Sequence, residues 1–336
     1  MRIIKSGLQT TIQDAGRYGY QRFGVIVSGV MDQMAYRIGN ILVGNQGNEA
    51  SIEMTMKGPE IEFEEDALIT ITGGNLSPTI DGNLIKLWRP IYVRAGTVLK
   101  FGGCTSGCRA YLAVGGGIDV PEVMDSRSTY MRAGIGGHEG RALKDDDCLK
   151  LCKPGERSNE ILKLLKDPDQ PYVESDWSSA SEWSTEESDE NIIRFIPGRE
   201  WSLFTQESQE AFTGEEFQLT PQSDRMGFRF KGAQLQLSEK IDMISEAVAF
   251  GTVQVPSEGN PIILLADRQT AGGYPKIAQI ATADFSKVVQ LKPGEKVRFK
   301  KITHKEAEKL FIEQEEHVQQ IEQGISLKLR EGGYNG

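Results

Sequence analysis

The chain has 336 residues, of which 38% are hydrophobic and 26% are charged, and its formal net charge is −10. This size allows two domains or one large domain with a substantial core. Phosphate binding needs clustered Lys and Arg, and no such block stands out, so we expect no nucleic-acid partner. No apolar run reaches the roughly 18 residues of a membrane span. The first residues also lack the apolar core of a signal peptide, so we expect a cytoplasmic protein that does not enter a membrane.

Along most of the chain, short apolar stretches of strand length alternate with glycine-containing turns, which is typical of a mainly β protein with few helices. The clearest stretches are 67–72, 91–101, 110–114, 192–196, 261–266 and 296–301. Helical spacing of apolar residues predicts a helix at 31–43, capped by Asp32 and Gly44. A similar pattern predicts a surface helix from 305 to about 323.

The two halves of the chain carry similar motifs in the same order. Glu53 and Gly58 match Glu246 and Gly251 at equal spacing, and both halves have an apolar run that ends in polar residues. A chance match of β-patterned segments is the alternative to a duplication. We interpret the pattern as two β-barrel domains from a tandem duplication. The predicted domains are a first barrel at 1–103, a glycine-rich insertion packed on the barrels at 104–152, an acidic Ser-rich linker at 153–191, a second barrel at 192–300, and a C-terminal helix and tail at 301–336.

Cysteine and histidine give little support for a metal centre. The cysteines form two pairs, 104/108 and 148/152, with wider spacing than a tight zinc knuckle, and the second pair has the alternation of a strand. Small buried thiols are therefore favoured over a four-thiolate site. The histidines at 138, 304 and 317 are far apart, so we expect no histidine-based catalytic centre and no metal.

The first candidate site is the loop before the predicted helix at 31–43. A glycine-loosened loop at a helix start can offer backbone N–H groups to an anion, and Arg17, Ser28 and Gly29 lie in this loop. Arg17 could also grip a carboxylate or phosphate. The alternative is that Asp14 pairs with Arg17 within a turn, while Asp32 only caps the helix.

The second candidate site is the glycine-rich stretch 112–137, where Arg127 and Ser128 could hold an anionic group. The stretch lacks the Lys-Ser/Thr ending of a P-loop, and no helical pattern follows it as a dinucleotide site would require. The alternative is a hydrogen-bonded network within the turn.

The third candidate site combines two Asp-Arg dipeptides at predicted strand ends, Asp224-Arg225 and Asp267-Arg268, with Gln254 on a third segment. The carboxylates could transfer protons, and the arginines could bind a carboxylate or carbonyl oxygen. The alternative is that each Asp locks its own Arg in a buried pair. We favour a polar cluster on one rim of the second barrel, because binding groups are often presented at strand ends.

Six motifs together resemble the family of the 5-oxoprolinase C subunit, also known as the KipA or KipI-antagonist family. They are similar as well to one half of the carboxyltransferase region of urea carboxylase. The motifs are TTIQDAGR at 10–17, SGVMD at 28–32, YLAV with GGIDVP at 111–121, SRST at 126–129, SDRMG at 223–227 and ADRQTAGGYP at 266–275. One departure is Asp125, where the family pattern usually has Gly. The acidic stretch 178–190 is also unusually long.

The resemblance implies two cyclophilin-like β-barrels and a subunit of an ATP-dependent 5-oxoprolinase, a hydrolase that opens 5-oxoproline to L-glutamate with the A and B subunits. The chain would dock most directly on the KipI-like B subunit and would be inactive alone. It would bind no cofactor by itself, since ATP would be handled by a partner chain. Under this hypothesis the catalytic residues are Asp224 and Asp267, the substrate-binding residues are Arg225, Arg268, Gln254, Arg127, Ser128, Gly272 and Tyr274, and the anion-binding loop holds Arg17, Ser28 and Gly29.

Two alternatives stay open. The chain could be a regulatory antagonist that binds a KipI-type inhibitor of a histidine kinase. It could also be half of a biotin-dependent carboxyltransferase. It contains no Met-Lys-Met biotin-attachment sequence, so biotin would have to arrive on another protein.

Overall fold

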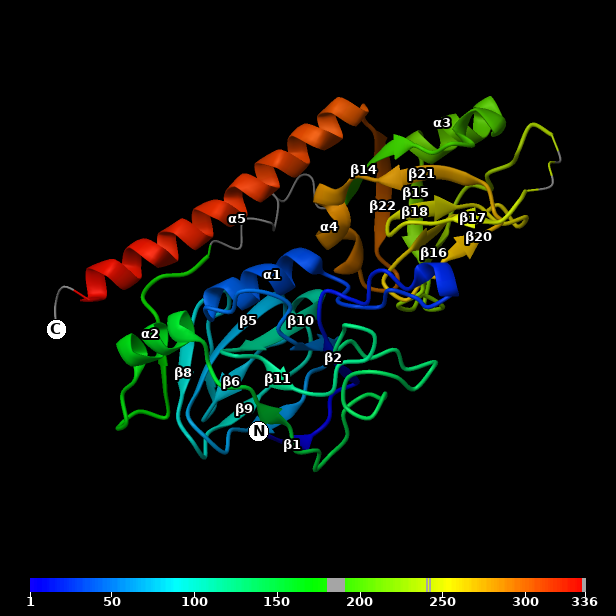
Figure 1. The fold of residues 1–336 in the computed structure, drawn as a ribbon. Coiled ribbons are helices and arrows are strands. Elements are labelled where there is room, and N and C mark those ends of the chain that lie inside the picture. Colours follow the sequence, from blue (N-terminus) through cyan, green and yellow to red (C-terminus); the bar gives the residue numbers. More distant parts are fainter. Residues whose placement is uncertain (180–190, 240, 242, 334–336) are drawn as a thin grey trace. The chain divides into compact units, whose positions relative to one another are not determined.

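The computed structural model describes residues 1–179, 191–239, 241 and 243–333, and these residues are mainly β with five α-helices (Figure 1). The chain forms two compact units. The first unit comprises residues 1–16, 32–181 and 316–336, and the second comprises 17–31 and 182–315. Within the described ranges, no helix combines the length and the hydropathy that a membrane span needs.

The first unit is built on two antiparallel sheets and a short ribbon. The five-stranded sheet has the order β1-β4-β9-β6-β7, the six-stranded sheet has the order β13-β8-β5-β10-β3-β2, and β11 pairs with β12. The strands are β1 (Arg2–Lys5), β2 (Gln9–Gln13), β3 (Ser51–Thr55), β4 (Glu60–Glu62), β5 (Ala67–Asn75), β6 (Thr79–Ile80), β7 (Asn83–Leu84), β8 (Ile91–Val93), β9 (Val98–Lys100), β10 (Ser106–Val114), β11 (Ile118–Asp119), β12 (Lys150–Leu151) and β13 (Tyr172–Glu174).

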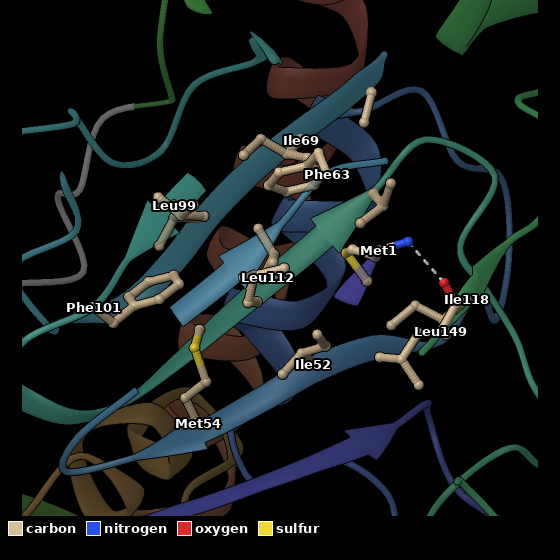
Figure 2. Packing of buried hydrophobic residues seen from close by; sticks show 14 of the residues in the cluster. Met1, Ile52, Met54, Phe63, Ile69, Leu99, Phe101, Leu112, Ile118 and Leu149 are labelled. Atoms are coloured by element: carbon tan, nitrogen blue, oxygen red, sulfur yellow. Dashed lines mark hydrogen bonds between the residues drawn. The ribbon is translucent and has the colours of Figure 1, made fainter. Parts of the chain in front are cut away.

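Side chains from both sheets fill the core of the first unit. Figure 2 shows Ile52, Ile69 and Leu112 of the six-stranded sheet together with Leu99 of the other sheet, and all four are fully buried. Burial of each large aliphatic side chain stabilises the fold by about 1.5–3 kcal/mol. The N-terminal Met1 belongs to the same cluster, and its ammonium group donates a hydrogen bond to the carbonyl oxygen of Leu149 at 3.0 Å.

Helix α1 (Gln33–Leu42) confirms the helix predicted from apolar spacing, and it packs on β5 and β10 (Figure 1). The Asp32 carboxylate caps it by accepting a hydrogen bond from the Ala35 amide at 3.0 Å. Gly44 follows the helix with a φ of 74°. A Cβ there would lie 2.7 Å from the backbone nitrogen of Ser158, so this position requires glycine.

The second unit contains a closed barrel of seven strands in the order β14-β21-β18-β19-β16-β15-β22, and a ribbon of β17 and β20. The strands are β14 (Ile192–Pro197), β15 (Glu216–Leu219), β16 (Gly227–Lys231), β17 (Glu246–Ala247), β18 (Thr252–Gln254), β19 (Ile262–Leu264), β20 (Ala271–Gly272), β21 (Lys276–Ile280) and β22 (Lys296–Lys301). This unit also contains α3 (Gln206–Gly214) and α4 (Phe285–Val289). The core is rich in phenylalanine, with Phe212 and Phe299 stacked at 4.5 Å between ring centroids.

The mainly β prediction is confirmed, but two tandem cyclophilin-like barrels are not. The second unit has a closed barrel, whereas the strands of the first unit divide into separate sheets. Strand β10 comes from the expected insertion at 104–152, yet it lies between β5 and β3 in the six-stranded sheet. Hydrogen-bond register in a sheet depends on distant segments, which single-strand patterns do not reveal.

The expected linker at 153–191 contains regular structure. It holds α2 (Glu156–Leu165) and β13, which pairs with β8. Most of the acidic Ser-rich part, residues 180–190, lies outside the described residues. The predicted C-terminal helix is present as α5 (His304–Gly333), which runs longer than the apolar pattern indicated.

The four cysteines do not form one class of buried thiols. All are free; Cys108 is buried, Cys104 and Cys152 are half-buried, and Cys148 is exposed.

A buried carboxylate ties the start of α4 to strand β14. Asp284 is fully buried and accepts hydrogen bonds from Arg194, at 2.7 Å from the backbone amide and 2.9 Å from Nε. We expect Asp284→Ala to lower the free energy of unfolding by about 3 kcal/mol, because it removes a buried carboxylate together with its hydrogen bonds from Arg194. Urea unfolding measures the loss. Glu216→Ala removes exposed ion pairs to Lys296 and Arg298 and is the control with little effect. Equal losses in both variants would contradict this account.

A second carboxylate makes the stability of the first unit depend on pH. Hydrogen bonds from Arg141, at 2.7 and 2.9 Å, lower the pKa of Asp147 to about 2. The unfolded chain binds this proton near pH 3.9, so the stabilisation is complete above about pH 4 and is lost as pH falls toward 2. We expect Asp147→Asn to lower the thermal midpoint at pH 6, and the gap from wild type to close between pH 4 and pH 2. A gap that stays constant over this range would refute the assignment.

Candidate functional site

The register of two barrel strands brings both Asp-Arg dipeptides to one end of the second unit. Strands β16 and β19 are antiparallel, with Gly227 opposite Leu264. The pairing continues past the strands, because the Asp267 amide donates to the carbonyl oxygen of Arg225 at 2.8 Å. The dipeptide before β16 and the dipeptide after β19 are therefore neighbours.

Asp267 pairs with the arginine of the other dipeptide rather than with its own neighbour. Arg225 donates to Asp267 twice, from Nε to Oδ2 and from Nη2 to Oδ1, both at 3.1 Å. Each side chain belongs to a residue that is only 6% exposed. Ser28 Oγ also donates to Asp267 Oδ1 at 2.9 Å, and Arg225 Nη2 donates to the carbonyl oxygen of Gly29. We call these four residues the Asp267 cluster.

The Asp267 cluster holds a turn in an unusual backbone conformation. Ser28 has a φ of 56° and Gly29 a φ of 84°. The left-handed region costs a residue with a side chain about 1–2 kcal/mol, while glycine adopts it freely. The hydrogen bonds of Ser28 to Asp267 and of Gly29 to Arg225 fix this turn against the strand ends. Arg17, at the start of the same loop, is fully buried, and its amide donates to the carbonyl oxygen of Val27 at 2.8 Å.

The other two members of the dipeptides have different surroundings. Asp224 is exposed, and its Oδ1 accepts a hydrogen bond from the Met226 amide at 2.8 Å, which caps the turn before β16. Arg268 is half-buried and donates to the carbonyl oxygens of Val248 and Leu265, at 3.4 and 3.2 Å. Burial lowers the pKa of Arg268 from its ordinary value, and the nearby Tyr18 phenol acts in the opposite direction.

Gln254, Gly272 and Tyr274 form a separate group. Gln254 pairs with Ile262 at the start of β19, whereas Asp267 follows the end of that strand. The Gln254 amide lies 3.5 Å from the carbonyl oxygen of Tyr274, and a Cβ at Gly272 would be 2.5 Å from Gln254 Nε2. The register places the backbone of Gln254 opposite the start of β19, while its side chain and that of Gln269 both reach Gly272.

Arg127 and Ser128 lie in the first unit, around a buried carboxylate. Asp14 is fully buried and accepts hydrogen bonds from the Arg127 amide at 2.6 Å, from Ser126 Oγ at 2.7 Å and from Ser128 Oγ. The Arg127 guanidinium pairs with Glu122 at 2.8 Å. The contacts of Ser128 thus match the alternative of a hydrogen-bonded turn network. Asp14 is the centre of this network, whereas its place in the sequence suggested only a partner for Arg17.

The departure from the family pattern at Asp125 has a backbone explanation. Met124 and Asp125 have φ values of 55° and 56°, and the Val123 amide closes the turn by donating to the carbonyl oxygen of Ser126 at 2.8 Å. Glycine adopts this conformation without cost, and aspartate tolerates it better than most residues. The turn therefore forms with Asp in place of Gly.

A second buried polar group in the first unit was not predicted. Tyr111 donates to Glu53 Oε2 at 2.7 Å and accepts from the Asp32 amide at 2.7 Å, at the start of α1. Burial raises the pKa of Tyr111 well above its ordinary value, so its hydroxyl stays a donor. Tyr111 and Glu53 are opposite each other on β10 and β3, a pairing that only the sheet register reveals. No set of three metal-ligating side chains gathers anywhere in the part of the chain that the structure describes.

Comparison with known proteins places these features in a family. The family model described as carboxyltransferase domain, subdomain A and B, matches residues 23–301. The chain is 37% identical to the 5-oxoprolinase C subunit of Escherichia coli (strain K12) over 324 residues, which cover 96% of this chain and 97% of the relative. It is also 37% identical to the 5-oxoprolinase C subunit of Haemophilus influenzae over 320 residues, or 95% of this chain and 97% of that protein.

Urea-processing enzymes share the same fold over part of their length. The crystal structure of Kluyveromyces lactis urea carboxylase matches 96% of this chain with a TM-score of 0.84 and 30% identity. This chain spans only 29% of that protein. It spans 20% of the K. lactis urea amidolyase structure, which matches with a TM-score of 0.83. The chain therefore belongs to the carboxyltransferase family of subdomains A and B, and it is similar to two bacterial 5-oxoprolinase C subunits over nearly their whole length.

Proposed function

We propose that this chain is a subunit of an ATP-dependent 5-oxoprolinase that opens 5-oxoproline to L-glutamate together with the A and B subunits. The observation that carries the proposal is the extent of the match to the two bacterial C subunits. Each is 37% identical and is covered over 97% of its own length. The urea enzymes contain this region as a minor part of a longer chain, so their activities transfer less directly.

The reaction breaks the C–N bond of a lactam. Water supplies the oxygen that adds to the carbonyl carbon, and the ring nitrogen takes up a proton as it leaves. ATP serves to activate the amide oxygen, and a partner chain handles the nucleotide, because this sequence has no P-loop. The contribution of this chain is then to hold the substrate and to direct protons.

The Asp267 cluster suits an orienting role. Both oxygens of Asp267 already accept hydrogen bonds from Arg225, and one also accepts from Ser28. Asp267 therefore keeps the turn at Ser28 and Gly29 rigid, so that this loop can face an anionic group without rearrangement. Asp224 is the exposed carboxylate of the two dipeptides, and its exposure supports the proposal that it transfers protons. Within the second unit, Arg268 is the proposed binding residue, with Gln254, Gly272 and Tyr274 as a second set.

A second candidate function is one half of a biotin-dependent carboxyltransferase. The description of the matching family and the TM-score of 0.84 to urea carboxylase favour it. In that case biotin arrives on another protein, since the chain has no Met-Lys-Met sequence. The two functions differ in their product, because only the hydrolase releases glutamate.

Reconstitution with the A and B subunits tests the proposal. We expect ATP-dependent release of glutamate from 5-oxoproline only when all three proteins are present. Asp267→Asn is expected to reduce turnover about 100-fold, since it weakens the contacts that hold Arg225 and Ser28. Glu258→Gln changes an exposed carboxylate of the same unit and is the matched control with wild-type turnover.

The outcomes separate the two functions. A folded three-protein complex that releases no glutamate would refute the hydrolase, and carboxyl transfer from carboxybiotin by the same complex would support the second candidate. Wild-type turnover in a folded Asp267→Asn variant would remove Asp267 from the mechanism.

A further inference from the structure

The two arginines that follow aspartates differ in what balances their charge. Arg225 is paired with the Asp267 carboxylate through two hydrogen bonds. Arg268 donates hydrogen bonds to two backbone carbonyl oxygens, and its guanidinium carbon lies 6.0 Å from the centroid of the Phe250 ring. Among the residues that the structure describes, no carboxylate forms an ion pair with Arg268.

A half-buried guanidinium without a counter-ion is costly. Transfer from water disfavours the charged form, and carbonyl dipoles compensate only part of that loss. Arg268 shows this loss of stabilisation, because burial is the largest cause that lowers the pKa of its guanidinium group. An anion that reaches the guanidinium would restore the lost stabilisation.

The backbone contacts of Arg268 also fix its orientation. Nε donates to the carbonyl oxygen of Val248 at 3.4 Å and Nη1 donates to that of Leu265 at 3.2 Å, while Nη2 makes no hydrogen bond within the described residues. A planar guanidinium held in this way keeps donors available for an oxyanion, which arginine recognises better than lysine does. Asp267, the neighbour in sequence, cannot serve as the counter-ion without leaving Arg225 and Ser28.

We propose that Arg268 is the residue of the second unit that binds the carboxylate of the substrate, and that Arg225 is a structural counter-ion of Asp267. The identity of the substrate as 5-oxoproline rests on the function proposed above. We thus assign different roles to two arginines that both follow an aspartate in the sequence. Phosphate shares the oxyanion chemistry of a carboxylate, so the test has to distinguish the two.

The different roles of Arg268 and Arg225 can be tested by ligand-dependent thermal stability. The full chain is measured alone and together with the A and B subunits. The probes are 5-oxoproline, its carboxyl amide 5-oxoprolinamide, and inorganic phosphate. We expect 5-oxoproline to raise the thermal midpoint with increasing concentration, and the amide to have no effect over the same range. Arg268→Gln is expected to weaken 5-oxoproline binding about 10- to 100-fold, and Arg268→Lys less than that.

Arg229→Gln is the matched control, because Arg229 is an exposed arginine of β16 in the same unit. It removes one positive charge and should leave binding unchanged. Equal responses of Arg268→Gln and wild type to 5-oxoproline would overturn the proposal. Equal binding of the amide, a response to phosphate alone, or no response of wild type in either preparation would overturn it as well. Ligand binding that is lost in Arg268→Gln, in a complex that releases no glutamate, would support the site and refute the hydrolase function instead.

Discussion

The site depends on a buried ion pair between Arg225, just before strand β16, and Asp267, just after strand β19. Arg225 and Asp267 are each 6% exposed and share two hydrogen bonds of 3.1 Å. Such a pair tolerates little displacement, because removal of one partner leaves a buried charge at a cost of about 3–5 kcal/mol. The register of β16 and β19 brings the two side chains together, and their contact then fixes the turn at Ser28 and Gly29. The geometry of the site thus follows from an electrostatic constraint.

This constraint gives the two residues of each Asp-Arg dipeptide different tasks. Arg225 and Asp267 use their hydrogen-bonding capacity on each other and on the turn, which makes them a rigid support. Asp224 and Arg268 lie outside the ion pair, one exposed and the other half-buried without a carboxylate partner among the described residues. A support that does not rearrange allows the remaining groups to act on a ligand with little loss of entropy. Removal of the support should therefore affect turnover, and removal of Arg268 should affect binding.

Local patterns predicted the β-rich fold, helix α1 and the presence of both Asp-Arg dipeptides at strand ends. They could not predict which aspartate meets which arginine, because that depends on the pairing of Gly227 with Leu264. The Asp14 network joins residues more than a hundred positions apart, and no spacing rule reveals it. The order of the motifs predicted a closed barrel in the first half of the chain as well. Motif order indicates that segments are similar, but it does not indicate whether their strands close into a barrel.

A double-mutant cycle on Arg225 and Asp267 tests the central contact most directly. The variants are Arg225→Met, Asp267→Leu and the double variant, and the quantity measured is the free energy of unfolding in urea at pH 7. The account predicts a coupling energy of about 2 kcal/mol, with the double variant more stable than the sum of the two single losses implies. Strictly additive losses would show that the two side chains do not interact, and the geometry of the site would then need another cause.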